Sequence, residues 1–178
     1  MTRWSKNILL KNFVKVRNFD KVKPTEIMTT IQLTTKINAP KQIVFDTARD
    51  IDLHQKSVAT SNEKAIAGVT SGLINLNETV TWRGKHFGFY LTHKSRITKM
   101  ELHNYFLDEM EEGKFKSFKH QHIFEEENGV TIMKDHLEYE TPYGIFGELF
   151  DILCLEKHLT NFLLERNKIL KETAENQN

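Results

Sequence analysis

Hydrophobic and polar positions alternate with a period of two through most of the second half of the chain. Five successive stretches follow this pattern, which is typical of half-buried strands: residues 78–86, 89–99, 102–110, 115–126 and 130–140. Turn residues lie between them, and the Asn128-Gly129 pair is the strongest hairpin signal of the set. Strands joined by tight turns are antiparallel neighbours. The pattern therefore predicts a run of five hairpin-linked strands.

A strand and two short helices are predicted before this run, and one long helix after it. Residues 31–37 alternate as a strand, and Pro40 suits the first turn of a helix that breaks and restarts near residues 49–53. Residues 63–67 are compatible with a short edge strand. The stretch from 145 to 174 places most of its apolar residues on one stripe. We expect an α+β fold in which a curved antiparallel sheet of six or seven strands wraps around this helix and encloses a ligand cavity.

Length and charge divide the chain into a basic leader and one domain. Residues 1–27 carry seven basic and two acidic side chains, a net charge of +5 within a total of +1. We expect residues 1–28 to be a loosely ordered extension, either upstream of the true start or in contact with a membrane or partner. Residues 29–175 form the predicted domain, and 176–178 a tail. The acidic domain argues against a nucleic-acid partner, and membrane contact is expected only through the leader.

The single cysteine, Cys154, excludes an internal disulfide and fits a reducing compartment, so a cytoplasmic protein is expected. It lies between Leu153 and Leu155 in the predicted last helix. This position predicts a small buried hydrophobe rather than a nucleophile.

Several short segments resemble the SRPBCC superfamily, the START-like and pollen-allergen-like helix-grip proteins, and in particular its small bacterial members described as cyclases or ligand-binding proteins. The resemblance covers residues 29–175 and is carried by residues 36–40 with 44–46, 48–54, 81–88, 106–110, and 151–153 with 166–167. It implies a helix-grip fold and a hydrophobic or amphipathic small-molecule ligand, with no cofactor. The superfamily includes lipid carriers, hormone receptors, polyketide cyclases, ubiquinone-binding proteins and oxygenase subunits, so the resemblance does not name an activity.

Alternation along the predicted strands selects the residues that face the cavity, since every second side chain lies on the same face. Together with aromatic residues from the last helix and one strand start, the predicted ligand-binding residues are Trp82, His86, Phe89, Phe118, His120, His122, Phe124, Asp135, Phe146 and Phe150. A register slip of one residue would move a whole row to solvent.

The polar members of this set are open to several interpretations. They could anchor the polar group of a bound molecule. His120 or His122, oriented by Asp135, could perform the acid–base chemistry of a polyketide cyclase or dehydratase. His86, His120 and His122 could hold a metal ion, although no metal site is predicted. Some could simply satisfy buried hydrogen bonds or face water. We expect non-enzymatic binding of a small molecule, with the cyclase-like enzyme as the alternative and a protein-interaction module as the second alternative.

Two further polar groups are less informative. Asp108, Glu109, Glu111 and Glu112 precede a hairpin and are predicted to form a solvated turn. Arg166 and Asn167 could reach a carboxylate at one end of the cavity. The sequence contains no glycine-rich phosphate loop, no His-Glu-x-x-His motif and no nucleophile elbow.

Overall fold

A computed structural model describes residues 28–58 and 61–177, so predictions about the leader lie outside the described residues. Its strands form one seven-stranded sheet with the order β1-β7-β6-β5-β4-β3-β2, and every neighbouring pair is antiparallel. The strands are β1 (Met28–Ile37), β2 (Lys64–Gly68), β3 (Thr79–His86), β4 (Phe89–Glu101), β5 (Tyr105–Glu112), β6 (Ser117–Glu127) and β7 (Val130–Glu140). The predicted antiparallel α+β fold is confirmed.

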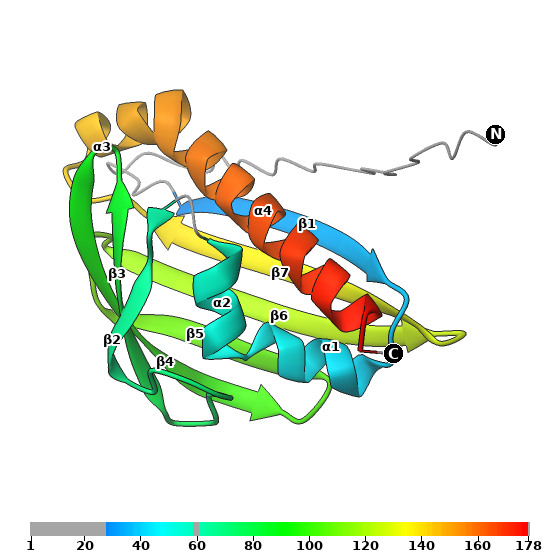
Figure 1. The fold of residues 1–178 in the computed structure, drawn as a ribbon. Coiled ribbons are helices and arrows are strands. Elements are labelled where there is room, and N and C mark those ends of the chain that lie inside the picture. Colours follow the sequence, from blue (N-terminus) through cyan, green and yellow to red (C-terminus); the bar gives the residue numbers. More distant parts are fainter. Residues whose placement is uncertain (1–27, 59–60, 178) are drawn as a thin grey trace, which may run out of the picture.

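Strands β2 to β7 follow one another along the sheet, and those from β3 onward are joined by short hairpin connections. The exception is β1, which pairs with the last strand of the run and places Ile31 opposite Leu137. The first and last strands of the chain are therefore neighbours (Figure 1).

Two short helices and one long helical stretch accompany the sheet. Helix α1 (Lys41–Ala48) is followed by α2 (Ile51–Ser57), whose first turn is capped by Asp50: the carboxylate accepts hydrogen bonds from the backbone N–H of Asp52 and Leu53 at 2.8 and 3.1 Å. The C-terminal stretch consists of α3 (Ile145–Phe150), the π-helical segment η2 (Asp151–Leu155) and α4 (Glu156–Glu175).

The long helix runs across one face of the curved sheet (Figure 1). One core cluster contains Phe45 of α1 and Leu170 of α4, and a second contains Tyr139 of β7 and Leu163 of α4. Cys154 is exposed, so the prediction of a buried cysteine is wrong. Cys154 lies with Ile152 and Leu153 on the exposed side of η2, whereas Asp151 and Leu155 are the buried residues of this segment.

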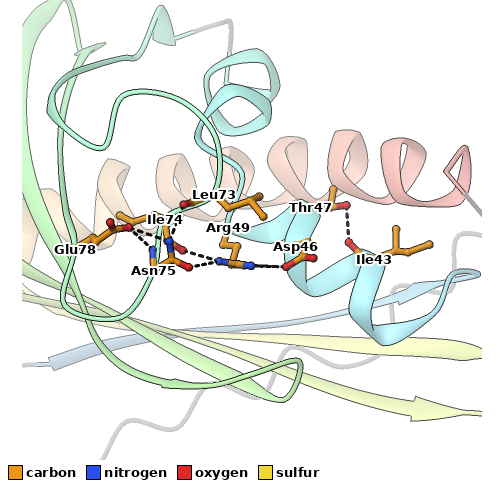
Figure 2. A network of polar contacts seen from close by, with 8 residues as sticks. All are labelled: Ile43, Asp46, Thr47, Arg49, Leu73, Ile74, Asn75 and Glu78. Atoms are coloured by element: carbon orange, nitrogen blue, oxygen red, sulfur yellow. Dashed lines mark hydrogen bonds and ion pairs between the residues drawn. The ribbon is translucent and has the colours of Figure 1, made fainter.

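A polar network fixes the end of α1 to the loop before β3 (Figure 2). The guanidinium of Arg49 donates to Asp46 at 2.8 and 2.9 Å, to the carbonyl of Ile74 at 3.2 Å and to Asn75 Oδ1 at 2.7 Å. Glu78 accepts from the backbone N–H of Asn75 at 2.7 Å. These bonds add to the backbone hydrogen bonds from Ile51 to Gly72 and from Ile74 to Arg49 that hold the loop against the helices. In the part of the chain described here, no helix is both long enough and apolar enough to cross a membrane.

Candidate functional site

A cavity of about 190 Å³ lies between the sheet and the helices α2 and α4. Its wall is rich in aromatic side chains: Trp82, Phe106, Phe115, Phe118 and Phe162. Phe87 and Lys114, in two turns at the same end of the sheet, also line it and are exposed, so the cavity reaches the surface there.

The inward rows predicted from strand alternation are largely found. Five of the predicted residues line the cavity: Trp82, His86, Phe118, His120 and His122. Asp135 is 1 % exposed and lies behind the two neighbouring histidines rather than at the cavity surface. The register places His122 opposite Asp135 and His120 opposite Asp108. A role of these side chains in binding stays a prediction.

Four predicted residues are not at the cavity wall. Phe124 is buried in the core, where its ring contacts those of Phe45 and Phe106. Phe89, Phe146 and Phe150 are 73 %, 82 % and 42 % exposed, so placing them in the pocket is wrong. Phe89 lies opposite His86 on the inner row but beyond Leu91, where the cavity wall ends on this strand, and α3 begins after the last strand has ended.

These exposed aromatics belong to a larger apolar surface, which we call the apolar rim. It consists of Phe87, Phe89, Tyr143, Ile145, Phe146, Leu149, Phe150, Ile152 and Leu153, all exposed. The Phe87 and Phe150 rings contact each other, with centroids 5.1 Å apart. Because Phe87 also lines the cavity, the rim extends to its mouth.

The first polar cluster combines β6, β7 and α4, and we call it the Asp135 cluster. His120 Nε2 lies 3.0 Å from Asp135 Oδ1 and is hydrogen-bonded to it. His122 Nδ1 lies 3.0 Å from the same oxygen, but outside hydrogen-bonding geometry. Asn167 donates to Asp135 Oδ2 at 2.6 Å, and the Arg166 guanidinium is 3.9 Å from Oδ1. The two α4 residues thus reach a carboxylate, as the sequence suggested.

Burial and hydrogen bonding set the charge states in this cluster. Burial alone would raise the pKa of Asp135, but the hydrogen bond from His120 and the electrostatic attraction of both histidines hold this pKa well below its usual value. Burial lowers the pKa of His122 well below the ordinary value, so this ring is neutral near pH 7. An ionised Asp135 can only accept hydrogen bonds, so the His120 nitrogen bonded to it, Nε2, carries a proton. When that ring is neutral, its Nδ1 is left as an acceptor.

The Asp135 cluster meets the distance requirement for a metal site, because donor atoms of His120, His122 and Asp135 all lie within 4.8 Å of one another. Two observations oppose a cation there. The Arg166 guanidinium already faces Asp135 Oδ1 at 3.9 Å, and Asn167 occupies Oδ2. The negative charge of Asp135 is therefore balanced by the protein, and the cluster fits an oriented histidine pair better than a metal centre.

A second polar cluster, the Glu63 cluster, lies on the opposite side of the cavity. Glu63 Oε1 is 2.8 Å from His54 Nε2, and Oε2 is 3.6 Å from His86 Nε2. His86 Nδ1 is 3.0 Å from His158 Nε2 on α4. Burial by itself raises the pKa of Glu63, but hydrogen bonds from His54 and His86 lower it to about 2. Sequence reasoning included only His86, since Glu63 precedes the short strand β2 and His54 lies on a helix of seven residues, where periodicity carries little information.

Asp108 also differs from its prediction as part of a solvated turn. It lies within β5, lines the cavity and is half-buried, and its Oδ1 is enclosed without a hydrogen-bond partner among the described residues. The hairpin turn begins later, after Glu112, so only the acidic residues at the end of β5 face solvent.

Solved structures share this architecture. The protein TTHA0849 from Thermus thermophilus has a TM-score of 0.66 and 19 % identity over 80 % of this chain and 94 % of its own. An aromatase/cyclase, Zhui, from Streptomyces sp. R1128 has a TM-score of 0.66 and 12 % identity over 83 % and 94 %. A START superfamily protein from Mycobacterium smegmatis has a TM-score of 0.63 and 11 % identity over 84 % and 99 %. No family model and no curated protein matches the sequence. The chain thus has the helix-grip, SRPBCC-type fold, as its sequence suggested.

Proposed function

We propose that the protein reversibly binds a hydrophobic or amphipathic small molecule in its cavity, as a non-enzymatic protein of the cytoplasm. The observation that carries this proposal is a cavity with an aromatic wall and polar clusters on opposite sides. Sites of this kind use apolar surface for affinity and a few fixed polar groups for orientation. An apolar cavity of about 150 Å³ is enough for benzene, so a volume of about 190 Å³ suits a compact ligand of one or two rings.

Native mass spectrometry of protein purified from its own host tests the proposal, together with a fluorescence titration with the two-ring probe 1-naphthylamine. Replacing Leu159, which lines the cavity, with Trp should fill part of the volume and weaken probe binding about tenfold. The matched control is Leu164→Trp on the same helix, where the side chain packs in the core and is not part of the cavity wall. Wild-type protein that carries no host molecule and binds no probe would contradict the proposal.

A second candidate function, a cyclase- or dehydratase-like enzyme, is favoured by the geometry of the Asp135 cluster. His120 lines the cavity and is hydrogen-bonded at 3.0 Å to a buried carboxylate, which is how a general base is oriented. In this function His120 Nδ1 would take a proton from a carbon next to a carbonyl, leaving the C–H electron pair in the enolate. Exchange of the α-protons of a small aryl ketone in D₂O, followed by NMR, is the test. An enzyme would accelerate exchange in wild-type protein and lose it in His120→Gln, whereas unchanged exchange would contradict this function.

A third candidate, a protein-interaction module, draws support from the number of large apolar side chains exposed in the apolar rim, since large exposed apolar patches often mark interaction sites. The rim adjoins the cavity mouth, so contact there is compatible with ligand binding.

A further inference from the structure

Three carboxylates are enclosed in or directly behind the cavity wall, and one of them lacks a partner. Asp135 receives hydrogen bonds from His120 and Asn167, and Glu63 is bonded to His54 and faces His86. Asp108 Oδ1, in contrast, is fully enclosed and accepts no hydrogen bond from the residues that the structure describes. An enclosed acceptor without a hydrogen bond destabilises the fold, and more so when it is charged. A hydrogen-bond donor from outside the described residues is therefore expected at Asp108 Oδ1.

The position of Asp108 indicates that a bound molecule supplies the missing hydrogen bond. Asp108 lines the cavity and lies opposite His120 in the strand register, beside Phe106 on the same inner row. A ligand whose polar group reaches Asp108 Oδ1 would therefore place its apolar part against the aromatic wall.

The charges around the cavity specify the kind of group. Besides histidines and Lys114, the charged side chains in or directly behind the cavity wall are the carboxylates of Asp50, Glu63, Asp108 and Asp135 and the guanidiniums of Arg49 and Arg166. Arg49 is already ion-paired with Asp46, so the carboxylates remain in excess. Burial lowers the pKa of Arg166, and attraction to Asp135, Asp108 and Glu63 opposes this shift. Lys114 lies at the exposed mouth and does not offset the excess of negative charge inside. Such an interior favours hydrogen-bond donors and cations and disfavours carboxylate ligands.

We propose that the cavity selects a compact apolar or aromatic molecule with a hydroxyl or ammonium group, and that Asp108 Oδ1 accepts the hydrogen bond from that group. This inference rests on the proposed binding function and adds a ligand class to it. It excludes fatty-acid anions as preferred ligands.

Four naphthalene probes of similar size test it by isothermal titration calorimetry at pH 7: 1-naphthol, 1-naphthylmethylammonium, 1-methoxynaphthalene and 1-naphthoate. The two donor probes should bind at least tenfold more tightly than the methoxy compound, and naphthoate should bind most weakly. The comparison of 1-naphthol with 1-naphthylmethylammonium distinguishes a hydroxyl ligand from a cation.

The variant Asp108→Asn keeps an oxygen acceptor but removes the charge, so it should abolish the extra affinity for 1-naphthylmethylammonium and reduce that for 1-naphthol, while keeping affinity for 1-methoxynaphthalene, which reports an intact cavity. Glu109→Gln is the matched control, because Glu109 is on the same strand and pairs instead with Lys119 and Thr98. If Asp108→Asn does not fold, the ¹³C resonance of the Asp108 carboxylate in wild-type protein serves instead. It should shift with 1-naphthol and not with 1-methoxynaphthalene.

Two results would overturn the inference in distinguishable ways. Equal affinity for 1-naphthol and 1-methoxynaphthalene would mean that water satisfies Asp108, and cavity binding itself would stand. Absence of binding by all four probes would overturn both this inference and the proposed function.

Discussion

Glu63 and Asp135 show how single carboxylates organise the cavity. Each is buried, and each holds two imidazoles within 3.6 Å of its oxygens. The two clusters come from different elements, Glu63 from the segment before β2 and Asp135 from the centre of β7. A buried carboxylate with fixed partners orients the rings, so His54, His86, His120 and His122 are held in defined positions among the histidines of the cavity wall.

The lowered pKa of Glu63 predicts a specific pH dependence of stability. Folding shifts this pKa from 4.5 to about 2, so ionised Glu63 stabilises the fold above pH 4.5, and this contribution is lost as the pH falls from 4.5 towards 2. Glu63→Gln should lower the free energy of unfolding by about 2 kcal/mol at pH 7. Urea denaturation at several pH values should show this difference shrinking below pH 4.5.

Glu127→Gln provides the control, since Glu127 is exposed at the end of β6 and should change stability by less than about 0.5 kcal/mol. A constant difference between wild type and Glu63→Gln from pH 7 to pH 3 would show that the charge of Glu63 does not stabilise the fold.

At the scale of elements, Gly147 determines how α3 approaches the end of β7. A Cβ atom at this position would lie 1.9 Å from the carbonyl oxygen of Pro142 and 3.0 Å from Thr141 Oγ1. In an ordinary helix, Gly→Ala gains about 1 kcal/mol. Here we expect Gly147→Ala to cost about 2 kcal/mol or more, because backbone must move. Chemical denaturation measures the effect.

Ile152→Ala is the comparison in the adjoining segment η2, where the side chain is exposed and the change should be within about 0.5 kcal/mol. Stabilisation by Gly147→Ala would show that α3 does not pack closely on the Pro142 carbonyl.

The strands could be predicted from the sequence because alternation directly encodes which side chains face the core. On β6, the even-numbered row from Phe118 to Phe124 faces inward, and this carried His120 and His122 to the cavity. His54, Glu63 and His158 could not be predicted in the same way. They lie on different segments and meet only through tertiary packing, so no local pattern links them. The rim residues Phe146 and Phe150 were misplaced because helical periodicity does not show where a helix extends past its sheet.

For the molecule as a whole, the leader is expected to be separable from the domain. The buried pattern of β1 begins at Ile31, after the first residues of the strand. A chain that starts at Met28 should therefore keep the thermal midpoint of the full chain within a few degrees. Differential scanning calorimetry of both proteins is the measurement.

A loss of more than about 2 kcal/mol on truncation would contradict this prediction, because burial of an aromatic residue from the leader on the domain is worth that much. Salt-sensitive cosedimentation of the full chain with anionic vesicles, absent after truncation, would instead assign the leader to a membrane surface.

The pairing of β1 with β7 has a consequence for biosynthesis. As the chain leaves the ribosome, β1 emerges first, but its partner emerges only after five other strands, and the helix that covers the cavity emerges last. Strand pairing over such long sequence separation is slow, and unpaired strand edges are prone to aggregation. The hairpin-linked strands can pair in turn, but the sheet and the cavity can be completed only after β7 and α4 have emerged. A product that stops before α4 would have no ligand site at all, rather than a weaker one.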